Sequence, residues 1–345
     1  MSAIKGMWKR IATQVEPLQR SSQCLSIIGN TAYMFGGELE PRKPRDNVVY
    51  SVALDATDTV DHGLVEAVRT DVSPSPRVGA ASTALGAKFY CFGGRGGVSM
   101  ACLQSKGSFD VFDKSSSLWS VITPAEGDVY PEDRSYHSMA SDGTSKIYLH
   151  AGCPAQGRLN DLWEFDATTL KWRQLPSAPG GGRGGTSIAY SSGAGKIYRI
   201  NGFDGKVEQG GTVDVYDVKD ERWSSVEYRP DGVGGPEPRS VAALVPVKTI
   251  HGSELLVTMF GEGSPSDLGH AGAGRMFSDV WVFDISTEKW HHVEFEEGEP
   301  APAPRGWFDA DVWAPGDGKG DRVVVHGGLH DSNRRLDDVW VLQIV

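Results

Sequence analysis

The sequence lacks any long apolar stretch: no run approaches 18 consecutive apolar residues, and the amino terminus MSAIKGMWKRIATQ has basic residues but no signal-peptide hydrophobic segment. We therefore expect a cytoplasmic protein without a membrane partner. An excess of positive charge is also absent, since the formal net charge is -11. An acidic chain is repelled by nucleic acid and by anionic membrane surfaces, which argues against non-specific binding to either.

Cysteine is scarce, and several catalytic motifs are missing. The four cysteines show no C-x-x-C or zinc-ribbon spacing, which indicates free and mostly buried thiols at Cys24, Cys91, Cys102 and Cys153. There is no P-loop, no G-x-S-x-G and no H-E-x-x-H. These absences remove the phosphate-loop enzymes, the serine hydrolases of that type and the zincins from consideration.

Glycine and proline are abundant, with 43 and 19 residues, and no segment shows a long 3.6-residue apolar period. Such punctuation is typical of a turn-rich all-β protein. Although 345 residues are enough for two domains, all-β folds often run to this length as one unit. We expect a single domain over residues 1–345.

An internal repeat defines the expected architecture. Short proline-containing segments such as PSPR, PEDR and PAPR recur, and each opens a unit of about fifty residues, the period of kelch repeats. The sequence therefore predicts a six-bladed kelch-type β-propeller. Its blades open near Arg20, Arg77, Arg134, Arg183, Arg239 and Arg305.

Each unit contains the same succession of strands, and the last unit is short. A small-residue strand is followed by an aromatic strand that runs into glycine, an alternating strand and an outer strand with tryptophan, as in LKWRQL. Blade one has an acidic link at 55–63 in place of the tryptophan strand. The sixth unit stops after its third strand, and the pattern around Trp8 predicts that residues 7–14 complete it and close the ring.

The repeated arginines favour a structural role, because a side chain at the start of each inner strand can bond backbone carbonyls and hold blades together. Function is better sought where the repeat is broken. Four polar or aromatic residues at loop positions suit a small anionic ligand with an organic side chain: Glu38, Arg95, Arg134 and Trp307. The alternative is that these are ordinary solvated loop residues.

The longest insertion, FGEGSPSDLGHAGAG at 260–274, gathers two carboxylates and an imidazole at Glu262, Asp267 and His270. Hard oxygen donors with one nitrogen suit a labile Fe(II) or Mn(II) better than structural zinc. The same residues are also compatible with a plain turn closed by an aspartate side chain. The residues alone are compatible with a metal site and with a plain turn.

At this point the chain resembles a known family, the kelch-repeat specifier proteins of glucosinolate breakdown. The resemblance spans nearly the whole chain and includes FGGE, FGGR, RSYHSM, PSDLGHAGAG and RGW. It implies a non-heme Fe(II) lyase with iron held by Glu-x3-Asp-x3-His. Glu262 and His270 keep the outer spacing, but position 266 is serine and the aspartate is Asp267. The implied substrate contacts are Glu38, Arg95, Arg134 and Trp307.

The resemblance also implies a reaction and a partner. Fe(II) would act on the thiolate sulfur of a thiohydroximate O-sulfate while Arg95 and Arg134 hold the sulfate, and loss of sulfate and sulfur would leave a nitrile. The substrate is a small organosulfur compound released by a thioglucosidase. Two rivals remain, a cyclase or isomerase of specialised metabolism with the same pocket and a non-catalytic kelch interaction module. Monomer and homodimer both stay open.

Overall fold

The computed structural model describes residues 4–55, 65–68, 70 and 72–345, and for His270 the backbone alone. Within these residues the helical elements are two short 3-10 turns, η1 (Glu16–Leu18) and η2 (Gly269–Ala271). No helix in the described ranges is long and apolar enough to span a membrane. The acidic link predicted at 55–63 lies almost entirely outside the described residues.

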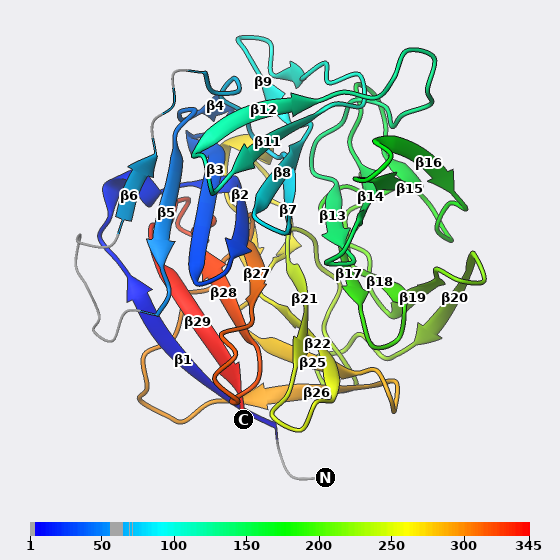
Figure 1. Ribbon diagram of the computed structural model, residues 1–345. Helices are drawn as coiled ribbons and strands as arrows, with labels where there is room; N and C mark the ends of the chain where they lie inside the picture. The colour runs from blue at the N-terminus through cyan, green and yellow to red at the C-terminus, as the bar shows by residue number, and fades with distance from the viewer. Residues whose placement is uncertain (1–3, 56–64, 69, 71) are drawn as a thin grey trace.

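Four blades are separate sheets arranged around a common centre, as Figure 1 shows. Blade one contains β2 (Ser21–Ile28), β3 (Thr31–Glu40), β5 (Val49–Ala53) and β6 (Val65–Val68), with β4 (Lys43–Pro44) beside β3. Blade two contains β7 (Ala81–Leu85), β8 (Lys88–Phe92), β11 (Phe109–Asp113) and β12 (Leu118–Ile122). Blade three contains β13 (Ser138–Ser141), β14 (Lys146–Gly152), β15 (Leu159–Asp166) and β16 (Lys171–Leu175). Blade four contains β17 (Ser187–Ser191), β18 (Lys196–Ile200), β19 (Thr212–Asp217) and β20 (Arg222–Glu227).

The last two repeat units are joined in one eight-stranded sheet. Its first half contains β21 (Ala243–Lys248), β22 (Glu254–Met259), β25 (Val280–Asp284) and β26 (Lys289–Glu294). Its second half contains β27 (Asp309–Trp313), β28 (Arg322–His326), β29 (Val339–Ile344) and β1 (Ile4–Ala12). Two small ribbons lie outside the blades: β9 (Arg95–Gly96) with β10 (Ala101–Cys102), and β23 (Glu262–Ser264) with β24 (Arg275–Met276).

The N-terminal strand closes the ring, as the sequence predicts. In Figure 1 β1 runs beside β29, and their antiparallel register extends from the Gly6–Ile344 pair to the Ala12–Val339 pair. The expectation of six separate blades is corrected, because the structure has four separate blades and one double sheet. The reason is that β1 also pairs in parallel with β26, so one strand bonds to both neighbours. The innermost strands nevertheless contact one another in cyclic order, namely β2, β7, β13, β17, β21 and β27.

Apolar side chains fill the spaces between neighbouring blades. Val111 of blade two and Leu149 of blade three are fully buried in one shared cluster. The predicted outer-strand tryptophans contribute to these layers, since Trp172 stacks on Phe109 of the preceding blade with ring centroids 5.1 Å apart. Each such ring buries a large apolar area, and this burial stabilises the contact between neighbouring blades by roughly several kcal/mol. The core is therefore a ring of layers between blades.

A layer of buried arginines locks the blades together. Each guanidinium donates to a carbonyl at the end of the second strand of its own blade, at 2.6–3.2 Å. Each backbone carbonyl of these arginines accepts the N–H of a glycine in the preceding blade, as Arg77 does from Gly37 at 2.8 Å. The structural interpretation of the repeat is confirmed. We call this set the arginine layer: Arg20, Arg77, Arg134, Arg183, Arg239 and Arg305.

Within the described part of the chain, five members of the arginine layer also form an ion pair with an aspartate near the start of the third strand. Arg183 is the exception, because Asp214, at the corresponding position, pairs with Arg199 at 2.6 Å. Removal of one partner of such a buried pair leaves an uncompensated charge, which costs about 3–5 kcal/mol. These pairs are therefore part of the scaffold.

Candidate functional site

A hydrogen-bonded ring narrows the centre of the propeller. Two positions after each arginine of the layer, the backbone adopts positive φ, and each N–H there donates to the carbonyl of the equivalent residue in the preceding blade at 2.7–3.1 Å. A left-handed backbone conformation is unfavourable for a β-branched residue such as Val241. The hydrogen bonds of the ring hold the backbone in this conformation. We call this set the central ring: Ser22, Gly79, Tyr136, Gly185, Val241 and Trp307.

One cavity lies against the central ring and is built from loops. Its volume is about 540 Å³. The lining loops follow the second strand of each blade, and three predicted residues, Glu38, Arg95 and Trp307, lie on it together with the predicted metal ligand Glu262. We call this the loop cavity. Its volume is in the range of small-molecule sites.

Arg134 does not belong to the loop cavity, and its predicted contact with sulfate is wrong. Its side chain is completely buried. The guanidinium forms a two-point ion pair with Asp161 at 2.6 and 2.8 Å and donates to the carbonyls of Ala151 and Glu132. Its hydrogen bonds are therefore directed into the arginine layer and not toward the loop cavity. The sequence places Arg134 both in the arginine repeat and among the substrate contacts, and the structure places its side chain in the repeat alone.

Arg158, which the sequence reasoning missed, lines the loop cavity. Its guanidinium lies 5.2 Å from the centre of the Phe203 ring. Arg95, on the neighbouring side, donates to the Ser135 hydroxyl and to the Pro154 carbonyl, both at 2.8 Å. Both arginines lower the pKa of the adjacent Cys153 thiol, although burial raises it overall. Arg95 and Arg158 are thus held in place by protein contacts, and Arg42 and Arg335 also line the cavity.

Glu38 is held by an arginine that the sequence reasoning also missed. The Arg335 guanidinium donates to Glu38 Oε1 at 2.9 Å, and the backbone N–H of Arg42 donates to Oε2 at 2.7 Å. Both carboxylate oxygens are therefore occupied by donors. This ion pair joins the loop of blade one to that of the last unit and fixes the carboxylate at the cavity wall.

Two aromatic members of the central ring form the floor of the loop cavity. The rings of Tyr136 and Trp307 meet edge to face with centroids 5.3 Å apart. Gly79 is required beside them, because a Cβ at its positive φ would lie 2.6 Å from the Tyr136 ring. Burial, with a smaller effect from the Glu38 charge, raises the pKa of Tyr136, so the phenol stays neutral. These rings offer an apolar surface to the organic part of a ligand.

The predicted metal ligands are only partly brought together. Glu262 is buried, and its Oε1 accepts the N–H of Gly274 at 2.9 Å while the Trp307 indole donates to the same carboxylate. Burial raises the pKa of Glu262, and the two hydrogen bonds oppose that shift. Asp267 is exposed and is not part of the cavity wall, whereas Ser266 is. The side chain of His270 lies outside the described residues.

A second carboxylate faces Glu262. Glu208, in the loop that follows β18, lines the same cavity, and burial followed by the Glu262 charge raises its pKa to about 8, against the hydrogen bond from Ser240. Among the described residues no three His, Cys, Asp or Glu side chains are grouped as metal ligands. The available signal for Glu208 was positional, because Glu38, Arg95 and Glu262 also lie at or shortly after the ends of the second strands.

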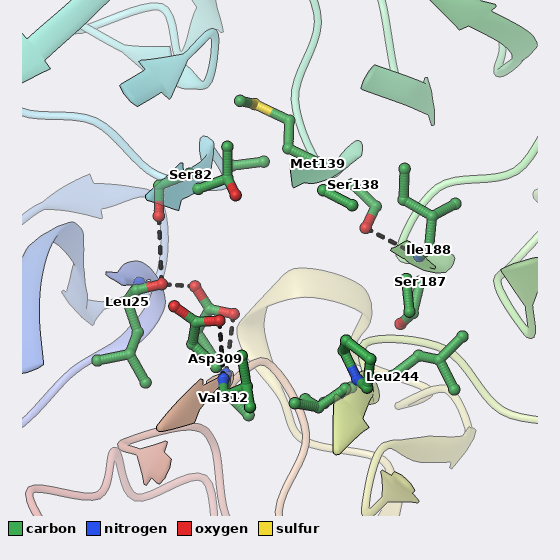
Figure 2. A pocket seen from close by; sticks show the side chains of 18 of the residues that line it. Leu25, Ser82, Ser138, Met139, Ser187, Ile188, Leu244, Asp309 and Val312 are labelled. Carbon is green, nitrogen blue, oxygen red and sulfur yellow. Dashed lines mark hydrogen bonds between the residues drawn. The ribbon is translucent and has the colours of Figure 1, made fainter. Parts of the chain in front are cut away.

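A second cavity, of about 500 Å³, continues along the axis on the far side of the central ring. It is lined by the inner strands, and Figure 2 shows Asp309 on its wall beside Leu25, with serine and apolar side chains of the other inner strands around the pocket. The backbone N–H of Leu25 donates to Asp309 at 2.7 Å, and that of Ile27 donates to Asp311 at 2.8 Å. Burial raises the pKa of Asp309 to about 8 and that of Asp311 to about 6. These carboxylates fasten the inner strand of the last unit to that of blade one.

Among known proteins, one relative matches this chain over the full length of both proteins, whereas another matches through its repeats alone. The chain is 27% identical to the N-(sulfonatooxy)prop-2-enimidothioate sulfolyase of Thlaspi arvense, over 99% of this chain and 98% of the relative. It is 21% identical to the leucine-zipper-like transcriptional regulator 1 homolog of Drosophila melanogaster, over 94% of this chain but 31% of that protein. The resemblance to specifier proteins is thus confirmed across the full length of one curated member.

Structural and family comparisons support the same fold. A solved structure titled "Structure of YjhT" matches with a TM-score of 0.69 and 14% identity, covering 95% of this chain and 98% of that one. A likeness at that identity concerns the fold alone. The family model described as the KLHDC2/KLHL20/DRC7 Kelch-repeats domain matches residues 21–261, which is more than half of the chain. The protein therefore belongs to this Kelch-repeats domain family.

Proposed function

We propose that this protein is an Fe(II)-dependent specifier-type lyase that converts glucosinolate aglycones, the thiohydroximate O-sulfates, into nitriles with loss of sulfur and sulfate. The observation that carries the proposal is the loop cavity, which combines cationic, carboxylate and indole groups in a chain similar over its full length to a sulfolyase. An aglycone has matching parts: a sulfate, a thiolate and an organic side chain. The protein would act alongside a thioglucosidase that releases this substrate.

Arg95 and Arg158 are suited to hold the sulfate, because guanidinium groups bind oxyanions through paired N–H donors. Arg95 is oriented by its bonds to Ser135 and Pro154, and Arg158 by the ring of Phe203. A leaving sulfate develops negative charge, so fixed cations beside it lower the barrier to its departure. Arg158 takes the place that the sequence assigned to Arg134.

Trp307 and Glu38 are suited to position the rest of the substrate. The indole of Trp307 packs against Tyr136 and lines the cavity, where it offers an apolar surface to a substrate group. Glu38 is held by Arg335, so its carboxylate can orient a polar substrate atom without rotating.

Glu262 is suited to hold the metal, because its buried carboxylate supplies an anionic oxygen donor at the cavity wall. Iron, when bound, would supply a Lewis acid for the thiolate sulfur. The exposed Asp267 does not fit that role by its position, and His270 remains a predicted ligand. The Trp307 indole and the Gly274 N–H fix the orientation of the Glu262 carboxylate before any metal arrives.

The test is a product assay with the full-length protein, a thioglucosidase and a glucosinolate. We expect the nitrile fraction to rise with added protein and Fe(II), at the expense of the isothiocyanate that forms without the protein. A chelator should reverse the effect. A nitrile-to-isothiocyanate ratio unchanged by both protein and chelator would contradict the proposed function.

A further inference from the structure

We infer that Leu329 borders the organic side chain of the substrate and limits its size, while the sulfate lies on the opposite side of the loop cavity. This inference deepens the proposed function and rests on it, because it assigns an orientation to the same thiohydroximate O-sulfate. It selects aglycones with an uncharged, apolar side chain. Leu329 lies in the loop between β28 and β29.

Each of the six units contributes one equivalent residue to the wall of the loop cavity. This residue is paired in β geometry with the residue directly after an arginine of the layer, as Cys153 is with Ser135 and Leu329 is with Gly306. All six residues line the cavity. We call this set the wall positions: Glu38, Arg95, Cys153, Phe203, Glu262 and Leu329. Since the inner strands follow one another in cyclic order, the wall positions surround the cavity in the same order.

A pair of cationic groups lies at the wall position of blade three. Arg95, from blade two, donates to the Cys153 carbonyl at 3.4 Å. Arg158 lies beside the same cysteine, because a Cβ on Gly184 would be 2.5 Å from the Cys153 sulfur and 3.7 Å from the Arg158 Nε. Its guanidinium reaches the Phe203 ring of blade four. The two arginines therefore flank the wall position of blade three.

The other two arginines that line the cavity are less suited to the sulfate. Arg335 is buried and donates to Glu38 at 2.9 Å, so its charge is already compensated. Arg42 is exposed, and its backbone N–H occupies the second oxygen of Glu38. The sulfate is therefore held best at blade three, where Arg95 and Arg158 can donate to it together.

Leu329 occupies the opposite side, because the sixth unit faces the third in a ring of six. Its side chain is 5% exposed and lines the cavity, yet among the described residues it belongs to none of the apolar clusters that fill the spaces between blades. Trp307 follows Gly306, the pairing partner of Leu329, so both apolar groups come from the sixth unit. This side of the cavity therefore suits an apolar group.

The substrate has a matching shape. In a thiohydroximate O-sulfate the sulfate is joined through oxygen to the nitrogen of a C=N bond, and the organic side chain is joined to the carbon. The two groups therefore project from opposite ends of one rigid unit. With the sulfate held at blade three, the side chain extends toward Leu329. A cavity of about 540 Å³ that is bounded in this way discriminates side chains by size.

The test is a competition between a small and a large side chain. The full-length protein with Fe(II) receives an equal mixture of allyl and benzyl glucosinolate, an excess of thioglucosidase hydrolyses both, and the two nitriles are quantified. We expect Leu329→Ala to raise the benzyl-to-allyl nitrile ratio by about 10-fold, because a few carbon atoms in an apolar pocket change discrimination by such a factor. Leu329→Phe fills the same space and should lower the ratio.

Leu336→Ala is the matched control, because Leu336 is also buried and lies in the same loop but does not line the cavity. Its melting temperature should fall, since a buried side chain is truncated, while the nitrile ratio stays within about twofold of wild type. A ratio that is unchanged in both Leu329 variants, or that shifts as much in Leu336→Ala, would overturn the inference.

The failure of this inference is distinct from the failure of the proposed function. If the wild-type protein forms nitrile from neither glucosinolate, the lyase proposal fails and the orientation of the substrate fails with it. If the wild-type protein forms nitriles and their ratio does not respond to either Leu329 substitution, the lyase proposal stands and the assignment of Leu329 fails.

Discussion

The arginine layer and the loop cavity both use arginine, for opposite purposes. Arg134 and Arg239 are completely buried, and each guanidinium group bonds an aspartate and two backbone carbonyls. Arg95 and Arg158 line a cavity and are only partly enclosed. Arg134 and Arg239 occupy a position that recurs in every unit, whereas Arg95 and Arg158 do not. The repeated arginines therefore serve the scaffold, whereas Arg95 and Arg158 lie where a ligand can reach them.

Deletion of residues 1–15 should give the largest effect and should act on the scaffold alone. The deletion removes β1, which bonds to both β29 and β26, and exposes the apolar edges of both strands. We expect the melting temperature to fall by about 10 °C or more, because the deletion removes several kcal/mol of stabilisation from buried apolar surface. An unchanged melting temperature in calorimetry would contradict the role of β1 in closing the ring.

Arg134→Met should be the most damaging single change within the comparison. The change leaves the Asp161 carboxylate without its ion-pair partner. We therefore expect the free energy of unfolding, measured with denaturant, to fall by about 3–5 kcal/mol. Arg134→Met with Asp161→Asn should recover part of that loss. Arg183→Met is a control that should cost less, since Asp214 pairs with Arg199. Equal losses at Arg134 and Arg183 would contradict the ion-pair explanation.

Arg158→Met should show the reverse pattern, with function reduced and stability retained. Methionine keeps much of the contact with Phe203 but removes the charge, so we expect a change in unfolding free energy below about 1 kcal/mol. Loss of a charged hydrogen bond to the substrate sulfate should raise KM for nitrile formation by about 10- to 100-fold. Normal KM together with a large loss of stability would place Arg158 in the scaffold.

Asp309→Asn should leave the stability at pH 5 nearly unchanged, and its effect should appear as a change in the pH dependence of stability. The folded pKa of Asp309 is about 8 against an ordinary value of 3.8, so the folded protein binds this proton more tightly than the unfolded chain. The resulting stability is complete below about pH 4 and is lost as pH rises toward 8. Between pH 5 and pH 8 the unfolding free energy should fall less steeply with pH in the variant than in wild type. The difference in slope should correspond to the loss of about one bound proton. The charged neighbour in wild type is Asp311, which the variant retains.

Substitution of Arg95 in the loop cavity should leave this pH slope unchanged, because Asp309 lies on the other side of the central ring and Arg95 is not among the groups that shift the pKa of Asp309 or of Glu208. A parallel pH series on Arg95→Met checks this separation. A slope that changes in Arg95→Met as much as in Asp309→Asn would show that the two cavities are coupled and would weaken the distinction between scaffold and site.

Much of the architecture was predictable from the sequence, because period-2 alternation, glycine ends and tryptophan strands are local signals. The closure by the N-terminal strand followed from counting strands in the last unit. The joining of the last two units into one sheet was not predictable, because it depends on a two-residue parallel pairing between β1 and β26. The placement of Arg134 was misjudged, since the motif around it looked unusual although the arginine itself obeys the repeat.

The sequence by itself determined the all-β propeller, the arginine layer and the candidate status of Glu38, Arg95, Trp307 and Glu262, because each is a matter of spacing within one unit. Only the tertiary structure decided which groups meet. Arg158, Arg335 and Glu208 come from three different units, and their loops converge because the inner strands close into a ring. Burial then decides the chemistry: the raised pKa of Glu208 and the exposure of Asp267 are properties of the fold that no linear motif contains.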